Sequence, residues 1–205
     1  TSNDRIEQYP TDYPTHCATA GIAAVAQTAI PMQPDVPYLA LDSWTIDDDA
    51  SGASSGNGNG IIEYSETIEL GVTLENLGIP DAVGVEATLL TDDTFVSLLS
   101  AQTTFGNIPG GGGLAASSTP FVFAVHSDVP DEHVVDFALA VTEQPDTLLF
   151  SLPVLAPDLN VVAFDADDTV GGDGDGIPEP GETIALTITV ANDGHAEVAE
   201  VIGVL

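Results

Sequence analysis

The sequence predicts an all-β protein, a β-sandwich with one complete domain followed by a partial second copy. Apolar and polar residues alternate with period two in most apolar segments, which is the pattern of half-buried strands. Seven or eight such segments fall within about 120 residues, the spacing typical of a β-sandwich. A glycine-spaced acidic loop followed by an alternating segment occurs twice, over 47–76 and 167–192. The chain therefore starts the same unit twice.

The first unit is predicted over residues 37–155. It starts with a strand over 38–46, whose Trp44 is the only tryptophan and is interpreted as a core anchor. The glycine run 110–113 lacks the Lys, Ser and helix signal of a phosphate-binding loop, so it is predicted to be a flexible turn. The second strand carries a row of apolar residues on one face, namely Ile68, Leu70, Val72 and Leu74. The remaining strands are expected at 85–89, 95–99, 120–126, 133–142 and 147–152.

Residues 156–205 start the second unit, which is predicted to stop after its third strand. The third strand is expected around 201–205, because Asn192 precedes Val201 by the same number of residues as Asn76 precedes Val85. A three-strand unit exposes an apolar face and an unpaired edge, and neither is stable alone in water. We therefore expect a strand from another chain, or from a continuation of this one, to complete the unit.

Residues 1–36 do not match the repeat and are predicted to be an N-terminal extension or linker. Within them, Cys17–Ile30 is apolar and alanine-rich, too short to span a bilayer and interrupted by Gln27. Three interpretations stay open: a helix against a neighbouring domain, a strand over Ala18–Ile30 donated to another subunit, or a remnant of a signal sequence. The acidic residues before it disfavour the last.

The charge of the chain is strongly negative, with 1 Lys+Arg against 33 Asp+Glu and a formal net charge of -32. This balance excludes nucleic acid and anionic membranes as partners, because both require cationic side chains. Divalent cations or high salt would stabilise so acidic a fold, so a saline habitat is a competing explanation for the acidity. Cys17 is the only cysteine, so no intrachain disulfide can form. Calcium could replace disulfides in an extracellular protein.

The two acidic loops match the ligand spacing of an EF-hand-type calcium loop with glycine at its sixth position. Gly60 and Gly176 occupy that position. The first position falls on Ser55 and Gly171, which carry no carboxylate, so the upstream aspartate pairs are expected to replace it. The candidate ligands of the first loop are Asp47, Asp48, Asn57, Asn59, the main-chain carbonyl of Ile61, and Glu66. Those of the second are Asp167, Asp168, Asp173, Asp175, the main-chain carbonyl of Ile177, and Glu182.

Calcium fits these ligands because it binds six to eight oxygen atoms in adaptable geometry. Zinc is disfavoured because neither loop contains Cys or His. The alternating segments after the loops exclude the exit helix of an EF-hand, so the loops are expected to lie between strands. Gly, Asp and Asn also form ordinary turns, and that alternative stays open. The same offset from glycine to glutamate in both copies favours calcium.

The segments GDGDGIPEPGETIALTITVANDG, GIPDAVGVEATLL, FGNIPGGGG and STPFVFAVHSDVPDEHVVDFALAVT carry a resemblance to a known family. Over residues 37–205 the chain resembles the calcium-binding immunoglobulin-like repeats of large secreted bacterial surface proteins, of the type found beside gingipain-like peptidases. The resemblance implies an immunoglobulin-like β-sandwich that serves as an exported, calcium-stabilised spacer or adhesion module. Asn57 and Asn59 depart from the aspartates usual in that family, which lowers the charge of the first site.

No catalytic motif accompanies these features. The four histidines and Cys17 lie outside any recognisable nucleophile motif. We therefore expect a noncatalytic extracellular or cell-surface module, forming a stalk or filament through self-association or through neighbouring domains of the same surface protein. One alternative is the accessory C-terminal region of a secreted peptidase or other exported enzyme. A carbohydrate-binding module ranks third, because aromatic residues make up only 6% of the chain and lie mostly in strand-core register.

Overall fold

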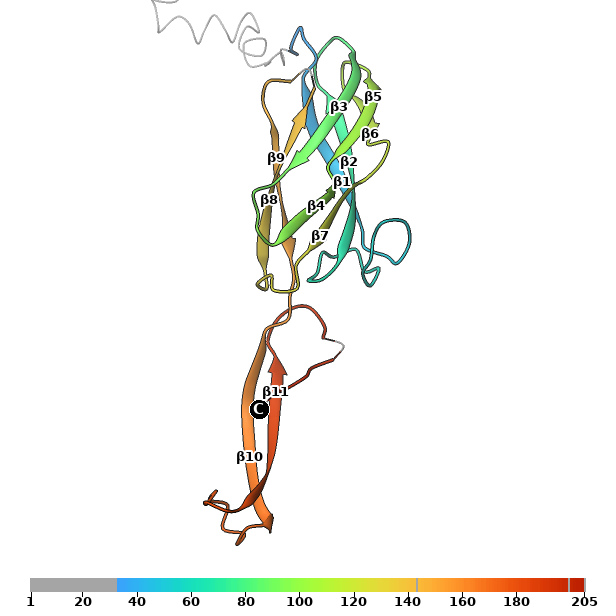
Figure 1. Cartoon of the computed structure of the whole chain (residues 1–205). Coiled ribbons are helices and arrows are strands. Elements are labelled where there is room, and N and C mark those ends of the chain that lie inside the picture. The colour runs from blue at the N-terminus through green and yellow to red at the C-terminus, as the bar shows by residue number, and fades with distance from the viewer. Residues whose placement is uncertain (1–32, 143, 199, 205) are drawn as a thin grey trace, which may run out of the picture. The chain divides into compact units, whose positions relative to one another are not determined.

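The computed structural model of the chain describes residues 33–142, 144–198 and 200–204 (Figure 1). All of its strands lie within the compact part of the chain Asp35–Leu205. The expectations for the N-terminal extension, including the segment Cys17–Ile30, lie outside the described residues. Within the described ranges, the regular structure consists entirely of β-strands, β1 to β11. The predicted all-β class is confirmed.

Two antiparallel sheets form the first unit. One sheet has the order β1-β2-β7-β4, and β6 also pairs with β2. The other has the order β5-β3-β8-β9. The strands of the first sheet are β1 (Leu39–Asp47), β2 (Thr67–Asn76), β4 (Val96–Ser100), β6 (Gly113–Ala116) and β7 (Phe121–Val125). Those of the second are β3 (Ala82–Leu90), β5 (Gln102–Ile108), β8 (His133–Val141) and β9 (Leu148–Val154).

The core lies between the two sheets and follows the alternation of the strands. The inward row of β2, predicted from its period-two pattern, is at most 1% exposed. Aromatic rings from both sheets meet at the centre: the ring centroid of Phe137 lies 5.3 Å from that of Phe123 and 5.4 Å from that of Phe150. Burial of these rings supplies a large part of the apolar area removed from water.

Trp44 differs from the prediction of a buried core anchor. Its side chain is 44% exposed, and its ring stacks on Phe150 with 5.9 Å between centroids. Among the residues that the structure describes, β1 is the edge strand of its sheet, so no further strand covers the outer side of the ring. Trp44 therefore closes the rim of the core and does not fill its centre.

Two strands were not expected from the sequence. β5 contains Gly106 at a φ of 70°, next to register shifts in its pairing with β3, so its apolar residues do not keep period two. β6 has only four residues and begins at Gly113. The rest of the glycine run, Gly110–Gly112, forms the predicted turn.

The second unit consists of the hairpin β10 (Leu159–Gly171) and β11 (Thr183–Asn192). It repeats the β1–β2 hairpin residue by residue: Leu159 pairs with Asn192 as Leu39 pairs with Asn76. The same irregularity follows Leu41 in β1 and Val161 in β10. The predicted partial second copy is therefore confirmed for its first two strands.

The predicted third strand of the second unit is wrong. Residues 200–204 form no strand. In the first unit the corresponding strand, β3, is held between β5 and β8. Among the described residues the second unit has no counterpart of β5 or β8, so its third segment has no edge with which to pair.

An asparagine fixes the end of each hairpin, and the one in the first hairpin, Asn76, is buried. The side-chain oxygen of Asn76 accepts hydrogen bonds from the N–H groups of Tyr38 and Gly78, at 3.2 and 3.0 Å. Its amide donates to the carbonyl oxygens of Pro80 and Ile108, at 2.9 and 3.1 Å. These four bonds satisfy main-chain N–H and carbonyl groups around the end of the hairpin.

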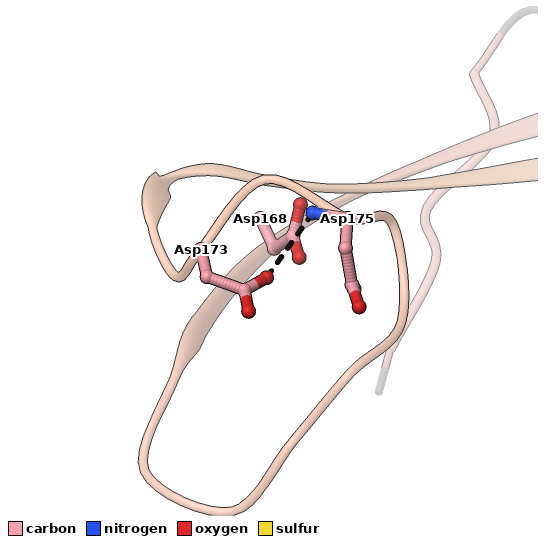
Figure 2. A group of neighbouring side chains, drawn as sticks. All are labelled: Asp168, Asp173 and Asp175. Atoms are coloured by element: carbon pink, nitrogen blue, oxygen red, sulfur yellow. Dashed lines mark hydrogen bonds between the residues drawn. The ribbon is translucent and has the colours of Figure 1, made fainter.

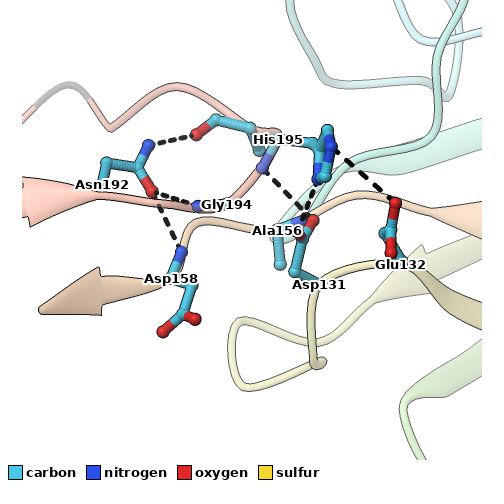
Figure 3. Close-up of polar contacts among 8 residues, drawn as sticks. Asp131, Glu132, Ala156, Asp158, Asn192, Gly194 and His195 are labelled. Carbon is cyan, nitrogen blue, oxygen red and sulfur yellow. Dashed lines mark hydrogen bonds and ion pairs between the residues drawn. The ribbon is translucent and has the colours of Figure 1, made fainter.

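The hairpin β10–β11 has the equivalent asparagine, Asn192 (Figure 3). Its oxygen accepts hydrogen bonds from the N–H groups of Asp158 and Gly194, at 3.0 and 3.1 Å, and its amide donates to the carbonyl of Ala196 at 2.8 Å. Three of the four bonds of Asn76 thus recur at the same relative positions.

A polar cluster joins the β7–β8 loop to the end of β11 (Figure 3). One carboxylate oxygen of Asp131 accepts hydrogen bonds from the main-chain N–H groups of Ala156 and His195, at 3.0 and 3.3 Å. The other lies 2.7 Å from Nδ1 of His195, whose Nε2 is 3.7 Å from a carboxylate oxygen of Glu132. The N–H of Ala156, followed by His195, lowers the pKa of Asp131 to about 2. The hydrogen bond that His195 donates to Asp131, and then the charges of Asp131 and Glu132, raise the pKa of His195.

These two pKa shifts predict a pH window for the cluster. The raised pKa of His195 gives stability that is complete below its unfolded value of 6.5 and is lost as pH rises through its folded value. The lowered pKa of Asp131 gives stability that is present above 3.8 and is lost as pH falls toward about 2. The contact is therefore expected to be strongest between these unfolded values. We expect Asp131→Asn to lower the pKa of His195 in an NMR titration, whereas Asp128→Asn leaves it in place; an unchanged pKa in Asp131→Asn would contradict the contact.

Candidate metal centre

The β10–β11 loop contains two clusters of acidic side chains, which we call its carboxylate groups. Figure 2 shows Asp168 at the end of β10 with Asp173 and Asp175 from the loop that follows. One oxygen from each of these three carboxylates lies within 4.8 Å of the others. Asp173 also forms a second group of this kind with Glu179 and Glu182. Neighbouring carboxylates repel one another, and a bound cation would relieve this repulsion.

Main-chain N–H groups hold the second loop in this shape. Asp168 is 2% exposed and accepts a hydrogen bond from the N–H of Gly176, at 3.2 to 3.3 Å from its two oxygens. Glu182 accepts hydrogen bonds from the N–H groups of Asp173 and Glu179, at 3.2 and 2.9 Å. Gly176 has a φ of 79°, a conformation that glycine adopts without strain. The predicted sixth position therefore has the backbone that requires glycine.

The β1–β2 loop is held in the same way. Asp48 is buried and accepts hydrogen bonds from the N–H groups of Gly58, Asn59 and Gly60, at 2.9 to 3.1 Å. Glu66 is also buried and accepts hydrogen bonds from the N–H groups of Asn57 and Glu63, at 3.2 and 2.9 Å. Burial raises the pKa of Glu66, and the charge of Asp48 adds to this, although the two N–H groups oppose it.

The two loops differ in how their charge is balanced. In the first loop, the side-chain amides of Asn57 and Asn59 both donate to the carboxylate of Glu63, the latter at 3.4 Å. In the second loop, aspartates replace both asparagines, and carboxylates face carboxylates. The amides thus stabilise the carboxylate of Glu63 in the first loop, whereas the second loop lacks such donors at these positions.

The structure brings together most of the predicted ligands. Asp48, Asn57, Asn59 and Glu66 are linked by hydrogen bonds within the first loop. Asp168, Asp173, Asp175 and Glu182 lie in the two groups of the second loop. The additional carboxylates are Glu63 and Glu179, which the prediction did not include. Each stands three residues before the predicted twelfth-position glutamate, so the repeated E-x-x-E spacing was a signal for them.

The upstream aspartates and the isoleucines have other contacts. Asp47 accepts a hydrogen bond from the N–H of Asp49 at 3.2 Å. Asp167 accepts one from the N–H of Thr169 at 2.9 Å and belongs to neither carboxylate group. The N–H groups of Ile61 and Ile177 donate to the side chains of Asn59 and Asp175, both two residues earlier, and so close a turn in each loop.

Two histidine pairs lie elsewhere on the sandwich. Nε2 of His126 is 2.9 Å from Oγ of Ser97, in an exposed position. Nε2 of His133 is 2.7 Å from a carboxylate oxygen of Asp93, and its ring meets that of Phe95 edge to face. A serine nucleophile requires a histidine base that is oriented by a third group. Within the described ranges no carboxylate contacts His126, so the Ser97 pair lacks that third group.

Comparisons with known proteins give likenesses to solved structures but no sequence relative. No protein-family model matches the sequence, and no curated protein matches it significantly. A solved structure, the CARDB domain of a Pyrococcus furiosus protein in complex with di-metal ions, aligns with a TM-score of 0.33 and 14% identity. The alignment covers 60% of this chain and 97% of that one. In the part of the chain that the structure describes, no helix is both long and apolar enough to cross a membrane.

Proposed function

We propose that the chain is a noncatalytic structural module of an exported or cell-surface protein, built from immunoglobulin-like units that calcium stabilises. The observation that carries the proposal is the duplicated loop, in which the same N–H groups and glutamates are arranged twice between paired strands. A metal bound there would fasten the first two strands of a unit together. We place the first unit at 37–155 and the second at 156–205, after the extension or linker 1–36.

The donor sets support calcium. The carboxylates of the second loop that would hold the ion are Asp168, Asp173, Asp175, Glu179 and Glu182. All are oxygen donors, the chemistry that calcium prefers. Asp168 and Glu182 already accept N–H bonds, but a carboxylate has about four lone-pair sites, so each can still bind a cation. An external location fits this proposal, because extracellular calcium is high enough for weak sites.

Calcium is expected to raise the melting temperature, and the second loop is expected to bind it more tightly than the first. At free calcium about a hundredfold above the dissociation constant, one site adds about 2.7 kcal/mol to the free energy of unfolding. Calcium titration by calorimetry and thermal melting would measure both effects. Glu182→Gln and Asp173→Asn should weaken binding at the second loop, whereas Asp165→Asn, on the adjacent strand β10, should not.

The first loop gives a test in the opposite direction. Replacing both Asn57 and Asn59 with aspartate should strengthen calcium binding at that loop, because it reproduces the carboxylates of the second. Sodium chloride at matched ionic strength is the control for general screening of the acidic chain. If sodium chloride raises the melting temperature as much as calcium does, and chelator has no effect, the calcium proposal is wrong.

A further inference from the structure

The β1–β2 loop carries two Asn-Gly dipeptides, Asn57-Gly58 and Asn59-Gly60, and no other asparagine of the chain precedes a glycine. An asparagine in this position is chemically labile, because the next main-chain nitrogen can attack the side-chain amide and glycine has no side chain to obstruct it. The product of the attack is a five-membered imide, which water opens. The two dipeptides are therefore candidate sites of deamidation.

The β10–β11 loop shows the residues that deamidation would create. Aspartates stand at the two equivalent positions there, Asp173 and Asp175, at the same distance before the loop glutamate. The glycines that follow have φ values of 82° and 79°, and Gly58 and Gly60 have 75° and 76°. The same backbone thus already carries aspartate in the second loop, so the conversion requires no other fold of the first.

The nitrogens that would attack both contact a buried carboxylate. The N–H groups of Gly58 and Gly60 donate to Asp48 at 3.0 and 2.9 Å. A hydrogen bond to a carboxylate leaves more electron density on the donor nitrogen. Both asparagines are exposed, so water reaches the imide once it forms. A Cβ added at Gly60 would meet no atom within 4 Å, so the space beside that nitrogen is open.

The side-chain amides are held at both of their polar atoms. Oδ1 of Asn57 accepts a hydrogen bond from the N–H of Asn59 at 3.0 Å, and Oδ1 of Asn59 accepts one from the N–H of Ile61 at 2.7 Å. Attack on the amide carbon places negative charge on this oxygen, which a donor already in place stabilises. Both Nδ2 atoms contact one carboxylate oxygen of Glu63, which would stabilise the ammonium that departs.

We propose that Asn57 and Asn59 are modification sites that convert to aspartate without an enzyme. First, the nitrogen of the following glycine bonds to the side-chain amide carbon, and the bond from that carbon to Nδ2 breaks. The amide nitrogen leaves as ammonia and takes the proton of the glycine N–H. Water then adds to the same carbon and breaks its new bond to the glycine nitrogen, which regains a proton. The resulting carboxylic acid ionises, and ammonia takes up its proton.

The consequence for the metal centre rests on the proposed calcium function. Conversion would give the first loop the carboxylates of the second and would remove the amide donors that contact Glu63. Calcium affinity depends on the number of charged ligands. The first loop should therefore bind calcium more tightly as the protein ages, whereas the second loop carries its aspartates from synthesis.

Peptide mapping by mass spectrometry, during incubation of the full chain at neutral pH without calcium, tests the proposal. Asn57 and Asn59 should gain the mass difference between OH and NH2, at least as fast as in a peptide of residues 54–61, SSGNGNGI. In water labelled with heavy oxygen, the new carboxylates should carry the label. Asn107 and Asn160 are internal controls: both are exposed, but a branched residue follows each, so they should stay unchanged.

Substitutions separate this chemistry from general instability of the loop. Asn57→Gln with Asn59→Gln keeps both amides but requires a six-membered ring, so conversion there should be undetectable over the same period. Glu63→Gln should slow conversion severalfold without changing the melting temperature in the absence of calcium. Glu69→Gln is its matched control, because Glu69 accepts a hydrogen bond from the same loop, at the N–H of Ala53, and contacts neither asparagine. It should leave the rate unchanged.

Three results would overturn the inference: both asparagines intact in the folded chain after the peptide has converted, isoaspartate as the only product in the folded chain, or equal conversion at Asn107 and Asn160. Calcium binding to fresh and aged chain is measured by calorimetry on the same samples. Conversion to aspartate without calcium binding at either loop would reject the metal centre alone. Calcium binding at the second loop, without conversion in the first, would reject the modification alone.

Discussion

Replacing Phe137 with alanine is expected to lower the free energy of unfolding by about 3 to 5 kcal/mol, the usual cost of removing a buried phenylalanine. Phe137 is 2% exposed and lies between Phe123 and Phe150, so its loss would leave a cavity that rings from both sheets border. The neighbouring rings cannot collapse into it without moving one sheet toward the other. Urea denaturation, followed by near-ultraviolet circular dichroism, would measure the change.

Leu149→Ala is the matched control for Phe137→Ala. Leu149 precedes Phe150 on β9 but is 75% exposed, because alternate residues of the strand face opposite sides. Its substitution should change the free energy of unfolding by no more than about 0.5 kcal/mol. Equal losses in the two variants would show that the core does not lie where the aromatic rings meet.

Asn76→Ala is expected to destabilise the sandwich by about 3 kcal/mol or more. Asn76 is fully buried, and its four hydrogen bonds satisfy the N–H groups of Tyr38 and Gly78 and the carbonyls of Pro80 and Ile108. Each buried main-chain group left without a partner costs about 1 to 3 kcal/mol, and water cannot replace the amide without opening the end of the sandwich. Thermal and urea unfolding would measure the loss.

Asn192→Ala is the natural comparison, because Asn192 makes three of the same bonds in an exposed setting. Solvent can reach the main-chain groups that lose their partner in Asn192→Ala, so the expected loss of stability is about 1 kcal/mol or less. Faster amide exchange at Asp158 and Gly194 would measure it. If Asn76→Ala and Asn192→Ala lower the free energy of unfolding equally, the burial of Asn76 does not set the size of the effect.

The sequence predicts the elements whose pattern is local and regular. β2 alternates without interruption and lies between neighbours on both sides, so period two alone identifies its buried face. β5 could not be recognised in this way, because Gly106 interrupts its alternation and its pairing with β3 shifts register there. Trp44 was misplaced for a different reason: the sequence shows that a residue is apolar but not that its strand is the edge of a sheet.

The candidate metal centre was predicted to a similar extent. Spacing from Gly60 and Gly176 identified the glutamate of each loop, Glu66 or Glu182, because the turn and its N–H groups are local features. The missing carboxylate at the first position of each loop pointed to the upstream aspartates, of which Asp48 and Asp168 are buried. The expectation of a third strand at 201–205 failed because a strand requires a partner edge, and spacing cannot supply one. Pairing partners are properties of the assembled sheet and are absent from a local pattern.

The near absence of cationic side chains in this protein has a further consequence. The chain has one Lys or Arg, Arg5, so residues 33–204 carry no permanently cationic side chain. The loop carboxylates of Asp48 and Glu66 accept hydrogen bonds from peptide N–H groups instead, and these groups bear no net charge. Electroneutrality around the folded units must therefore come almost entirely from the surrounding electrolyte. The stability and solubility of this molecule are therefore expected to depend on which cation the solution contains.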